Sequence, residues 1–468
     1  MITMTFTSQG KQPLYQQLYI HIRECIIQKK IQAGEKLPSK RKLATHLQLS
    51  NSTVENAYAQ LIAEGYILAK EKKGYYACLS EPVGHKIARE KIPKGQEESI
   101  TNPFLDLRTN VVDTESFPFS VWTRLTRESL REKKTSLLES GHPQGDLNLR
   151  QEIAFYLKNF RTMNVSPDQI VVGAGMEYLL GLITELVPGQ PFAIETPCYP
   201  KLPQILKNKK IPLFPIPMDQ EGISMSSLEK TKAEIVFLTP SCHFPLGTVT
   251  TANRRLQLLN WANQSESRYL IEDDYDSEYR YHLKPIPPLY SLDTHHKVIY
   301  LNTFARTLAP SLRIGYMILP ESLLTRYHQT LQIYSCTVSR FDQATLQKFM
   351  QNDHYERHLH RMKLIYKARR DILLSELSKL TSDFSIQSST AGLHLIITAN
   401  NQFSEKIMIQ KLLNQGVRVY PLSDYYWGTS RKISHSVLLG FGGIKNDDLR
   451  KASKIIVETL NGIAHESP

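Results

Sequence analysis

The sequence has few of the features that mark secreted or membrane proteins. Its 468 residues include only five cysteines, an odd number spread along the chain, so their spacing supports neither a disulfide framework nor a zinc site. No apolar run approaches the roughly 20 residues that cross a bilayer. The first residues lack the charged start and apolar stretch of a signal peptide. We therefore expect a cytoplasmic protein with no metal site and no membrane contact.

The composition is that of a folded chain with a basic N-terminal end. Hydrophobic residues make up 41% of the sequence and charged residues 22%, which excludes a fully disordered protein. The length predicts two or three domains of about 100 to 200 residues each. The net charge is +12, and half of this excess lies in residues 1–80, which hold 11 Lys and Arg against five Asp and Glu. Such asymmetry favours nucleic-acid binding at that end, although solvated basic faces without a partner are also common.

Three zones follow one another along the chain. Residues 1–79 are dense in helix signals and close with a short aromatic and basic segment. Residues 80–103 are rich in Pro, Gly, Glu and Lys, which predicts a flexible linker. In residues 104–468, short apolar strands alternate with helical patterns, which predicts an α/β domain with a mainly parallel sheet. After about residue 331, long helices and then short strands predict a smaller C-terminal α+β subdomain.

The first zone has the pattern of a helix-turn-helix followed by a hairpin. Apolar residues four apart over 14–26 predict one helix, and a second helix begins at Ser39, which is a plausible cap. A third helix follows the turn LQLS, and Ser52 and Glu55 have the spacing of a capping box. Residues 67–78 predict a β-hairpin wing. The alternative is a generic three-helix module, but the wing, the basic run KRK and the charge excess favour DNA binding.

This architecture identifies the residues that would contact DNA. The first residues of the third helix can reach base edges in a major groove, and the wing carries two basic residues. These residues are Asn51, Ser52, Thr53 and Asn56 in the helix and Lys72 and Lys73 in the wing. The string GEKLPSKRKLA, with SNSTVENAY, EGY and GYY after it, resembles the winged helix of GntR-type bacterial repressors. That resemblance implies contacts of double-stranded operator DNA with Arg41, Ser52, Thr53 and Gly74, and it places Ser39 and Lys73 close by.

Three motifs of the last zone point to a phosphate-bearing ligand. The run GAGMEYLLGLI follows a strand and opens a helix, whose N–H groups can hold phosphate, although a plain strand–helix turn has the same pattern. The run IEDDYDSEY places acids at a strand end, where one can pair with a protonated pyridine nitrogen or simply cap the next helix. In YLNTFARTLAPSLRIGY, Arg313 is placed to clamp a phosphate.

Together these motifs resemble fold-type I aminotransferases, which use pyridoxal phosphate (PLP), and more closely the MocR branch of the GntR regulators. The resemblance covers roughly residues 104–445 and includes HPQGDLNLRQEIAFYL, ETPCYP and FLTPSCHFPLG. It implies that Asp273 faces the pyridine nitrogen, that Tyr275 faces the ring hydroxyl, and that Tyr199 lies near the ring or the substrate. The phosphate would be surrounded by Gly175, Met176, Glu177, Thr303 and Arg313.

One departure from the family pattern affects the chemistry directly. The family stretch FSKTLAP carries the lysine that forms the Schiff base with PLP, but here the stretch reads FARTLAP, with Arg306 at the lysine position. An imine needs an amine lone pair, and arginine stays protonated in proteins. We therefore assign no catalytic residue and predict that PLP, if it binds, is held non-covalently. Arg306 is then an anion-binding residue that could hold phosphate, a phosphorylated metabolite or PLP. Leu438 stands near the place of the arginine that grips substrate carboxylates in many aminotransferases, and Lys201 could supply a positive charge instead.

These observations predict a bacterial transcription regulator that binds an operator as a homodimer. Its aminotransferase-like domain would sense a small-molecule effector, either PLP-like or a phosphorylated or amino-acid metabolite, without transaminase turnover. Two alternatives remain open. One is an active PLP-dependent aminotransferase with an accessory DNA-binding head, and the other is a dead scaffold that serves only for dimerisation.

Overall fold

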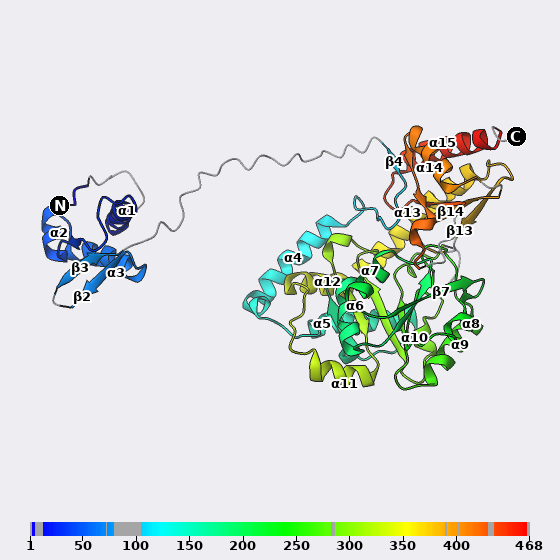
Figure 1. The fold of residues 1–468 in the computed structure, drawn as a ribbon, viewed down its shortest axis with the longest axis horizontal. Helices are drawn as coiled ribbons and strands as arrows, with labels where there is room; N and C mark the ends of the chain where they lie inside the picture. Colours follow the sequence, from blue (N-terminus) through cyan, green and yellow to red (C-terminus); the bar gives the residue numbers. More distant parts are fainter. Residues whose placement is uncertain are drawn as a thin grey trace. The chain divides into compact units, whose positions relative to one another are not determined.

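The computed structural model divides into two compact units, Met1–Thr101 and Asn102–Pro468, and each is described by itself (Figure 1). Lys72 and the predicted linker, residues 80–103, lie outside the described residues. Among the residues described, none of the helices could cross a membrane. The structure describes residues 2–4, 13–71, 73–78, 104–281, 286–388, 391–400, 403–428 and 435–465.

The first unit is a winged helix-turn-helix. Three helices surround a core of fully buried side chains that includes Leu18, Leu43, Tyr58 and Leu61. The unit also contains a three-stranded antiparallel sheet of order β1-β3-β2, and the β2–β3 hairpin is the wing. The elements are α1 (Leu14–Ile27), β1 (Lys36–Leu37), α2 (Lys40–Leu47), α3 (Asn51–Ala63), β2 (Ile67–Lys70) and β3 (Gly74–Ala77).

The caps of α2 and α3 set the geometry of the helix-turn-helix. Ser39 caps α2, as the sequence indicated, through a hydrogen bond from the Lys42 N–H to its Oγ at 3.3 Å. The predicted capping box at Ser52 is wrong, because α3 begins earlier and Ser50 is its cap, accepting from the Thr53 N–H at 3.1 Å. The left-handed residue Gln48 ends α2 abruptly, so the turn is short and the chain re-enters a helix at residue 51.

The second unit contains an eight-stranded, mainly parallel sheet in the order β5-β12-β11-β10-β9-β6-β7-β8, in which β12 and β8 run antiparallel to their neighbours. Helices cover both faces, which is why its central strands read as continuous apolar runs. Val171 and Leu301 point into the layer with α6 and α11, whereas Val172 and Tyr300 point into the opposite layer with α5 and α12. The strands are β5 (Ile170–Gly173), β6 (Phe192–Thr196), β7 (Leu213–Asp219), β8 (Gly222–Ile223), β9 (Ile235–Leu238), β10 (Tyr269–Asp273), β11 (Val298–Thr303) and β12 (Gly315–Ile318). The helical segments are α4 (Phe119–Lys133), η1 (Lys134–Leu138), α5 (Leu147–Arg161), η2 (Pro167–Gln169), α6 (Met176–Leu186), α7 (Lys201–Asn208), α8 (Met225–Leu228), α9 (Ala252–Asn263), α10 (Leu289–Leu292), η3 (Pro310–Leu312), α11 (Glu321–Thr330) and α12 (Arg340–Gln351).

A smaller C-terminal subdomain packs three helices against a four-stranded antiparallel sheet of order β13-β14-β17-β16. Its first helix spans both cores, since Tyr355 is buried with the large sheet and Leu373 with the small one. Its elements are α13 (His354–Leu377), β13 (Phe384–Ser388), β14 (His394–Ala399), α14 (Glu405–Asn414), β15 (Val417–Arg418), β16 (Tyr420–Pro421), η4 (Leu422–Tyr425), β17 (Ser436–Gly440) and α15 (Asn446–His465). The predicted fold class is confirmed in both units.

The segment that follows residue 104 also joins this subdomain. Its strand β4 (Leu105–Asp106) pairs in parallel with β15, and the Gly440 N–H donates to the Leu107 carbonyl at 2.8 Å. Glycine is required at position 440, because a Cβ there would lie 2.1 Å from the carbonyl oxygen of Arg108. This close crossing carries the chain onward to Asn110, which lines the cavity described below.

The cap assignment makes a prediction for the free protein. Ser50→Ala removes the acceptor of the Thr53 N–H and should cost about 1 kcal/mol of local stability, which is roughly five-fold faster amide exchange in peptides that cover α3. Hydrogen-exchange mass spectrometry of the full chain measures this change. Ser52→Ala is the control and should accelerate exchange less than Ser50→Ala. A larger effect of Ser52→Ala would show that Ser52, and not Ser50, caps α3.

Candidate functional site

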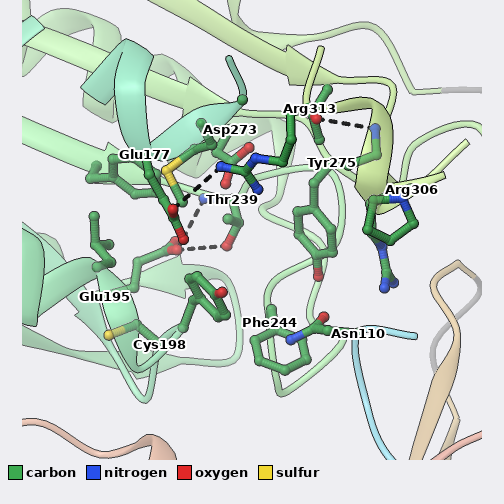
Figure 2. Close-up of a pocket in the computed structure, with 18 residues that line it drawn as sticks. Asn110, Glu177, Glu195, Cys198, Thr239, Phe244, Asp273, Tyr275, Arg306 and Arg313 are labelled. Atoms are coloured by element: carbon green, nitrogen blue, oxygen red, sulfur yellow. Dashed lines mark hydrogen bonds and ion pairs between the residues drawn. The ribbon is translucent and has the colours of Figure 1, made fainter. Parts of the chain in front are cut away.

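A cavity of about 200 Å³ lies in the second unit, where five strands of the large sheet end (Figure 2). The residues that follow the carboxyl ends of β5, β6, β9, β10 and β11 converge there, as is usual for ligand sites of parallel sheets. All nine ligand-site residues proposed from the sequence line this cavity: Gly175, Met176, Glu177, Tyr199, Asp273, Tyr275, Thr303, Arg306 and Arg313. Their convergence is a fact of the fold, and their binding of a ligand stays a prediction.

Asp273 presents a carboxylate to the cavity from the end of β10. Burial, together with the nearby charges of Asp274, Asp276 and Glu195, raises the pKa of Asp273 to about 7. Within the described residues this carboxylate has no hydrogen-bond or ion-pair partner. Its neighbour Glu272 points to the other side of the sheet and accepts from the Leu289 and Tyr290 N–H groups that begin α10. Glu272 therefore caps the next helix, whereas a role of Asp273 in pairing with a pyridine nitrogen stays a prediction.

Arg306 lies in the cavity wall (Figure 2), where a buried ion pair with Asp276 holds it. Its Nε and Nη2 donate to the two carboxylate oxygens of Asp276 at 3.0 and 2.9 Å, and the Asp276 side chain is fully buried. Burial alone would lower the pKa of Arg306, but the charge and hydrogen bonds of Asp276 raise it above its ordinary value. The buried Nη1 has no hydrogen-bond partner among the described residues. The position thus carries a permanently charged group that can only donate.

Aromatic side chains form the wall beside Arg306. The Arg306 guanidinium carbon lies 5.8 Å from the ring centroid of Tyr275, and the Tyr275 hydroxyl donates to the Cys242 carbonyl at 3.1 Å. Phe244 packs edge-on against both Tyr275 and Tyr199, with centroids 6.3 and 6.5 Å apart. Flat apolar faces of this kind suit a planar ring.

The start of α6 forms the cationic end of the cavity. Gly175 precedes the helix with a positive φ of 83°, and a Cβ there would lie 3.2 Å from Nη2 of Arg313. That Nη2 donates to the Ala174 carbonyl at 3.2 Å and to a Glu177 carboxylate oxygen at 3.3 Å. The Thr303 hydroxyl, on the neighbouring strand end, accepts from the Ala305 N–H at 3.2 Å.

Sequence reasoning missed several lining residues, of which Glu195 is the most consequential. Its Oε2 accepts from the Thr239 N–H at 3.0 Å and from the Thr239 hydroxyl at 2.8 Å. Burial raises the pKa of Glu195 to about 7 and lowers that of His243, whose Nε2 lies 3.7 Å away, to about 3. The available signal was an acid at the end of the apolar run FAIE, in the motif ETPCYP. Asn110, Cys198 and Phe244 also line the cavity.

The residues proposed to contact DNA belong to the first unit. Six of them are exposed: Ser39, Arg41, Asn51, Ser52, Asn56 and Lys73. Thr53 and Gly74 are half-buried, and Lys72 lies outside the described residues. Lys40 joins the two helices of the motif through an ion pair with Glu55 at 2.5 Å. DNA contact by these residues stays a prediction.

Comparisons with known proteins match both units. Residues 14–76 match the bacterial regulatory proteins of the gntR family, and residues 102–436 match aminotransferase class I and II. The chain is 38% identical to the uncharacterized HTH-type transcriptional regulator YdeL of Bacillus subtilis, over 94% of this chain and 96% of that protein. It is 31% identical to the HTH-type pyridoxine biosynthesis transcriptional regulator PdxR of Corynebacterium glutamicum, over 93% of each. It is 28% identical to the probable rhizopine catabolism regulatory protein MocR of Rhizobium meliloti, over 94% of this chain and 92% of that one.

Solved structures share the fold of the second unit. Kynurenine aminotransferase of Pyrococcus horikoshii superposes with a TM-score of 0.70 at 24% identity, covering 79% of this chain and 93% of that one. Multiple substrate aminotransferase of Thermococcus profundus gives the same score and identity over 83% and 98% of the two chains.

The Arg306–Asp276 pair makes a stability prediction. Arg306→Met and Asp276→Asn each leave one buried polar partner without the other and should destabilise the second unit by about 3 kcal/mol. The double variant should lose less than the sum of the two. Urea unfolding followed by tryptophan fluorescence measures this unit alone, because all three tryptophans, Trp122, Trp261 and Trp427, lie in it.

The matched control is Arg313→Met, which breaks an ion pair whose side chains are 52% and 38% exposed. Its loss should stay within about 1 kcal/mol, as is usual for exposed pairs. Equal losses for Arg306→Met and Arg313→Met would contradict a structural role for the buried pair.

Proposed function

The chain belongs to the MocR-type GntR regulators, HTH-type transcription regulators with an aminotransferase class I/II domain, and from this premise we propose that its second unit senses a small ligand without turning it over. The observation that carries the proposal is Arg306, a protonated guanidinium paired with Asp276 in the wall of the cavity. We take this residue to stand where the family has its reactive lysine. A guanidinium that stays charged offers no lone pair for covalent capture.

The cavity retains groups that fit PLP. Asp273 is a carboxylate without a partner among the described residues, and it suits a protonated pyridine nitrogen, whose charge would keep it ionised. Arg313 and the first N–H groups of α6 suit the phosphate, and Tyr199 and Tyr275 suit the ring. When bound, PLP supplies an aldehyde on an electron-withdrawing ring. Arg306 would donate hydrogen bonds to the ligand, which would be held non-covalently.

Regulation requires that the ligand change how the protein binds its operator. We propose a homodimer that presents two winged helices to paired half-sites. Large apolar side chains stand exposed on the second unit, among them Phe119, Leu138 and Phe155 at 67%, 75% and 61%, and a partner subunit would cover such surfaces. The effector, PLP-like or another phosphorylated or amino-acid metabolite, acts only if it binds one arrangement of the dimer better than the other.

The DNA-binding proposal separates two kinds of contact. Arg41→Ala should weaken operator binding by about 1 to 3 kcal/mol and relax its sequence preference, because Arg41 is proposed to contact bases. Lys73→Ala should weaken binding to all sequences alike, because Lys73 is proposed to contact phosphate. It should also reduce the slope of log binding constant against log salt concentration by about 1. Fluorescence anisotropy with operator and scrambled DNA across a salt series measures both. Lys230→Ala, an exposed lysine of the second unit, is the control.

The ligand proposal predicts the outcome of reduction with borohydride. Wild-type protein incubated with PLP should bind it in calorimetry but carry no added mass after reduction. Arg306→Lys should gain a new absorption band and, after reduction, one phosphopyridoxyl group at position 306, because an amine can add to the aldehyde. Arg306→Gln is the matched control, with no charge and no reactive amine.

Other results would favour the alternatives. A reduced adduct on a lysine of the wild-type protein would favour an active aminotransferase. Absence of binding by PLP, pyridoxamine phosphate and sugar phosphates in calorimetry would favour a scaffold used only for dimerisation.

A further inference from the structure

The cationic end of the cavity already contains an internal anion. The Glu177 carboxylate accepts from Lys201 Nζ at 3.0 Å and from Arg313 Nη2 at 3.3 Å, and the contact with Arg313 is visible in Figure 2. Glu177 comes from the first turn of α6 and Lys201 from the start of α7, whereas Arg313 follows η3. Glu177 and Arg313 line the cavity, whereas Lys201 lies outside its lining and reaches this end through its ion pair with Glu177.

The charges at this end are therefore partly neutralised before any ligand arrives. Arg313 and Lys201 bring two positive charges, and Glu177 removes one of them. The hydrogen bond from Lys201 lowers the pKa of Glu177, so this carboxylate is ionised at neutral pH. The helix N-terminus adds a favourable field for any anion, whether the carboxylate or a phosphate.

We propose that Glu177 is a specificity-determining residue that competes with the phosphate of the ligand for Arg313 and Lys201. This inference rests on the proposed ligand-sensing function and adds how the affinity of that site is set. A phosphate that enters must displace Glu177 from its two partners or bind beside a like charge. Either way, Glu177 lowers the affinity for a phosphorylated ligand.

The exposure of the three side chains decides how large this effect is. The side chains of Glu177, Arg313 and Lys201 are 38%, 52% and 63% exposed. Ion pairs in such positions are individually weak, so a phosphate with about two negative charges can replace the carboxylate. Glu177 therefore weakens the binding of a phosphorylated ligand without preventing it. It keeps occupancy reversible, which a sensor requires.

The test compares Glu177→Gln with wild type in the full chain, with PLP, inorganic phosphate and unphosphorylated pyridoxal as calorimetric probes. Glutamine keeps the size of the side chain and removes its charge. PLP affinity should rise about five- to ten-fold and inorganic phosphate should bind more tightly, whereas pyridoxal affinity should change less than about two-fold. The gain should shrink in high salt, which screens exposed charges.

Glu128→Gln is the matched control. Its side chain is 39% exposed and also lies near two basic side chains, Arg124 at 3.4 Å and Lys348 at 4.0 Å, but it does not line the cavity. It should leave PLP affinity unchanged. In an Arg313→Gln background, the gain from Glu177→Gln should also decrease, because one cation of the competition is gone.

The possible failures are distinguishable. If wild type binds PLP and Glu177→Gln binds it no better, or if Glu128→Gln gives the same gain, the inference about Glu177 is wrong and the ligand-sensing proposal stands. If wild type, Glu177→Gln and Arg306→Lys all fail to bind PLP, the ligand-sensing proposal fails. If only Glu177→Gln binds PLP, Glu177 lowers the affinity for the phosphorylated ligand, as proposed, and does so more strongly than expected.

Discussion

The buried ion pair between Arg306 and Asp276 is the interaction on which the second unit depends. It belongs to a segment, residues 272–278, in which five of seven residues are acidic, and the side chains of Glu272, Asp274 and Asp276 are buried. Unpaired charges in such a setting are costly, so most of these acids have a defined partner. Glu272 binds two backbone N–H groups, Asp274 pairs with Arg161, Asp276 pairs with Arg306 and Glu278 accepts from Asn302.

Asp273 is the exception within this segment, and its position explains why. The other four acids are compensated inside the protein, whereas Asp273 faces the cavity without a partner among the described residues. A ligand with a protonated ring nitrogen would give Asp273 the partner that the other four acids find inside the protein. Arg306 thereby has two effects. It neutralises Asp276 in the wall, and it places there a group that only donates hydrogen bonds. The residue that satisfies Asp276 therefore offers the cavity no reactive amine.

Much of this architecture was accessible from the sequence, because its signals are local. Continuous apolar strands such as IVVG and YLIED predict a sheet covered on both faces, and their ends supply the cavity. Glu195 was missed despite a local signal, the acid at the end of FAIE, whereas other missed features depend on contacts between distant residues. Asn110 reaches the cavity only because its segment crosses β17 at Gly440, and Glu177 meets Lys201 only through packing of α6 beside α7. The cap of α3 was misplaced for a different reason, since Ser52 and Glu55 satisfied the capping-box spacing while Gln48 fixed an earlier start.

The cavity also limits what the proposed sensor can do. A ligand shifts a conformational equilibrium only by its difference in affinity between two states. Covalent capture by a lysine would form the same bond in both states, so the bond alone would not create such a difference. With Arg306 in the wall and Glu177 among the cations, binding rests on hydrogen bonds and exposed ion pairs, which form and break readily. A rearrangement of Arg313 between two states would therefore change the affinity, and such a difference is what the proposed sensor needs.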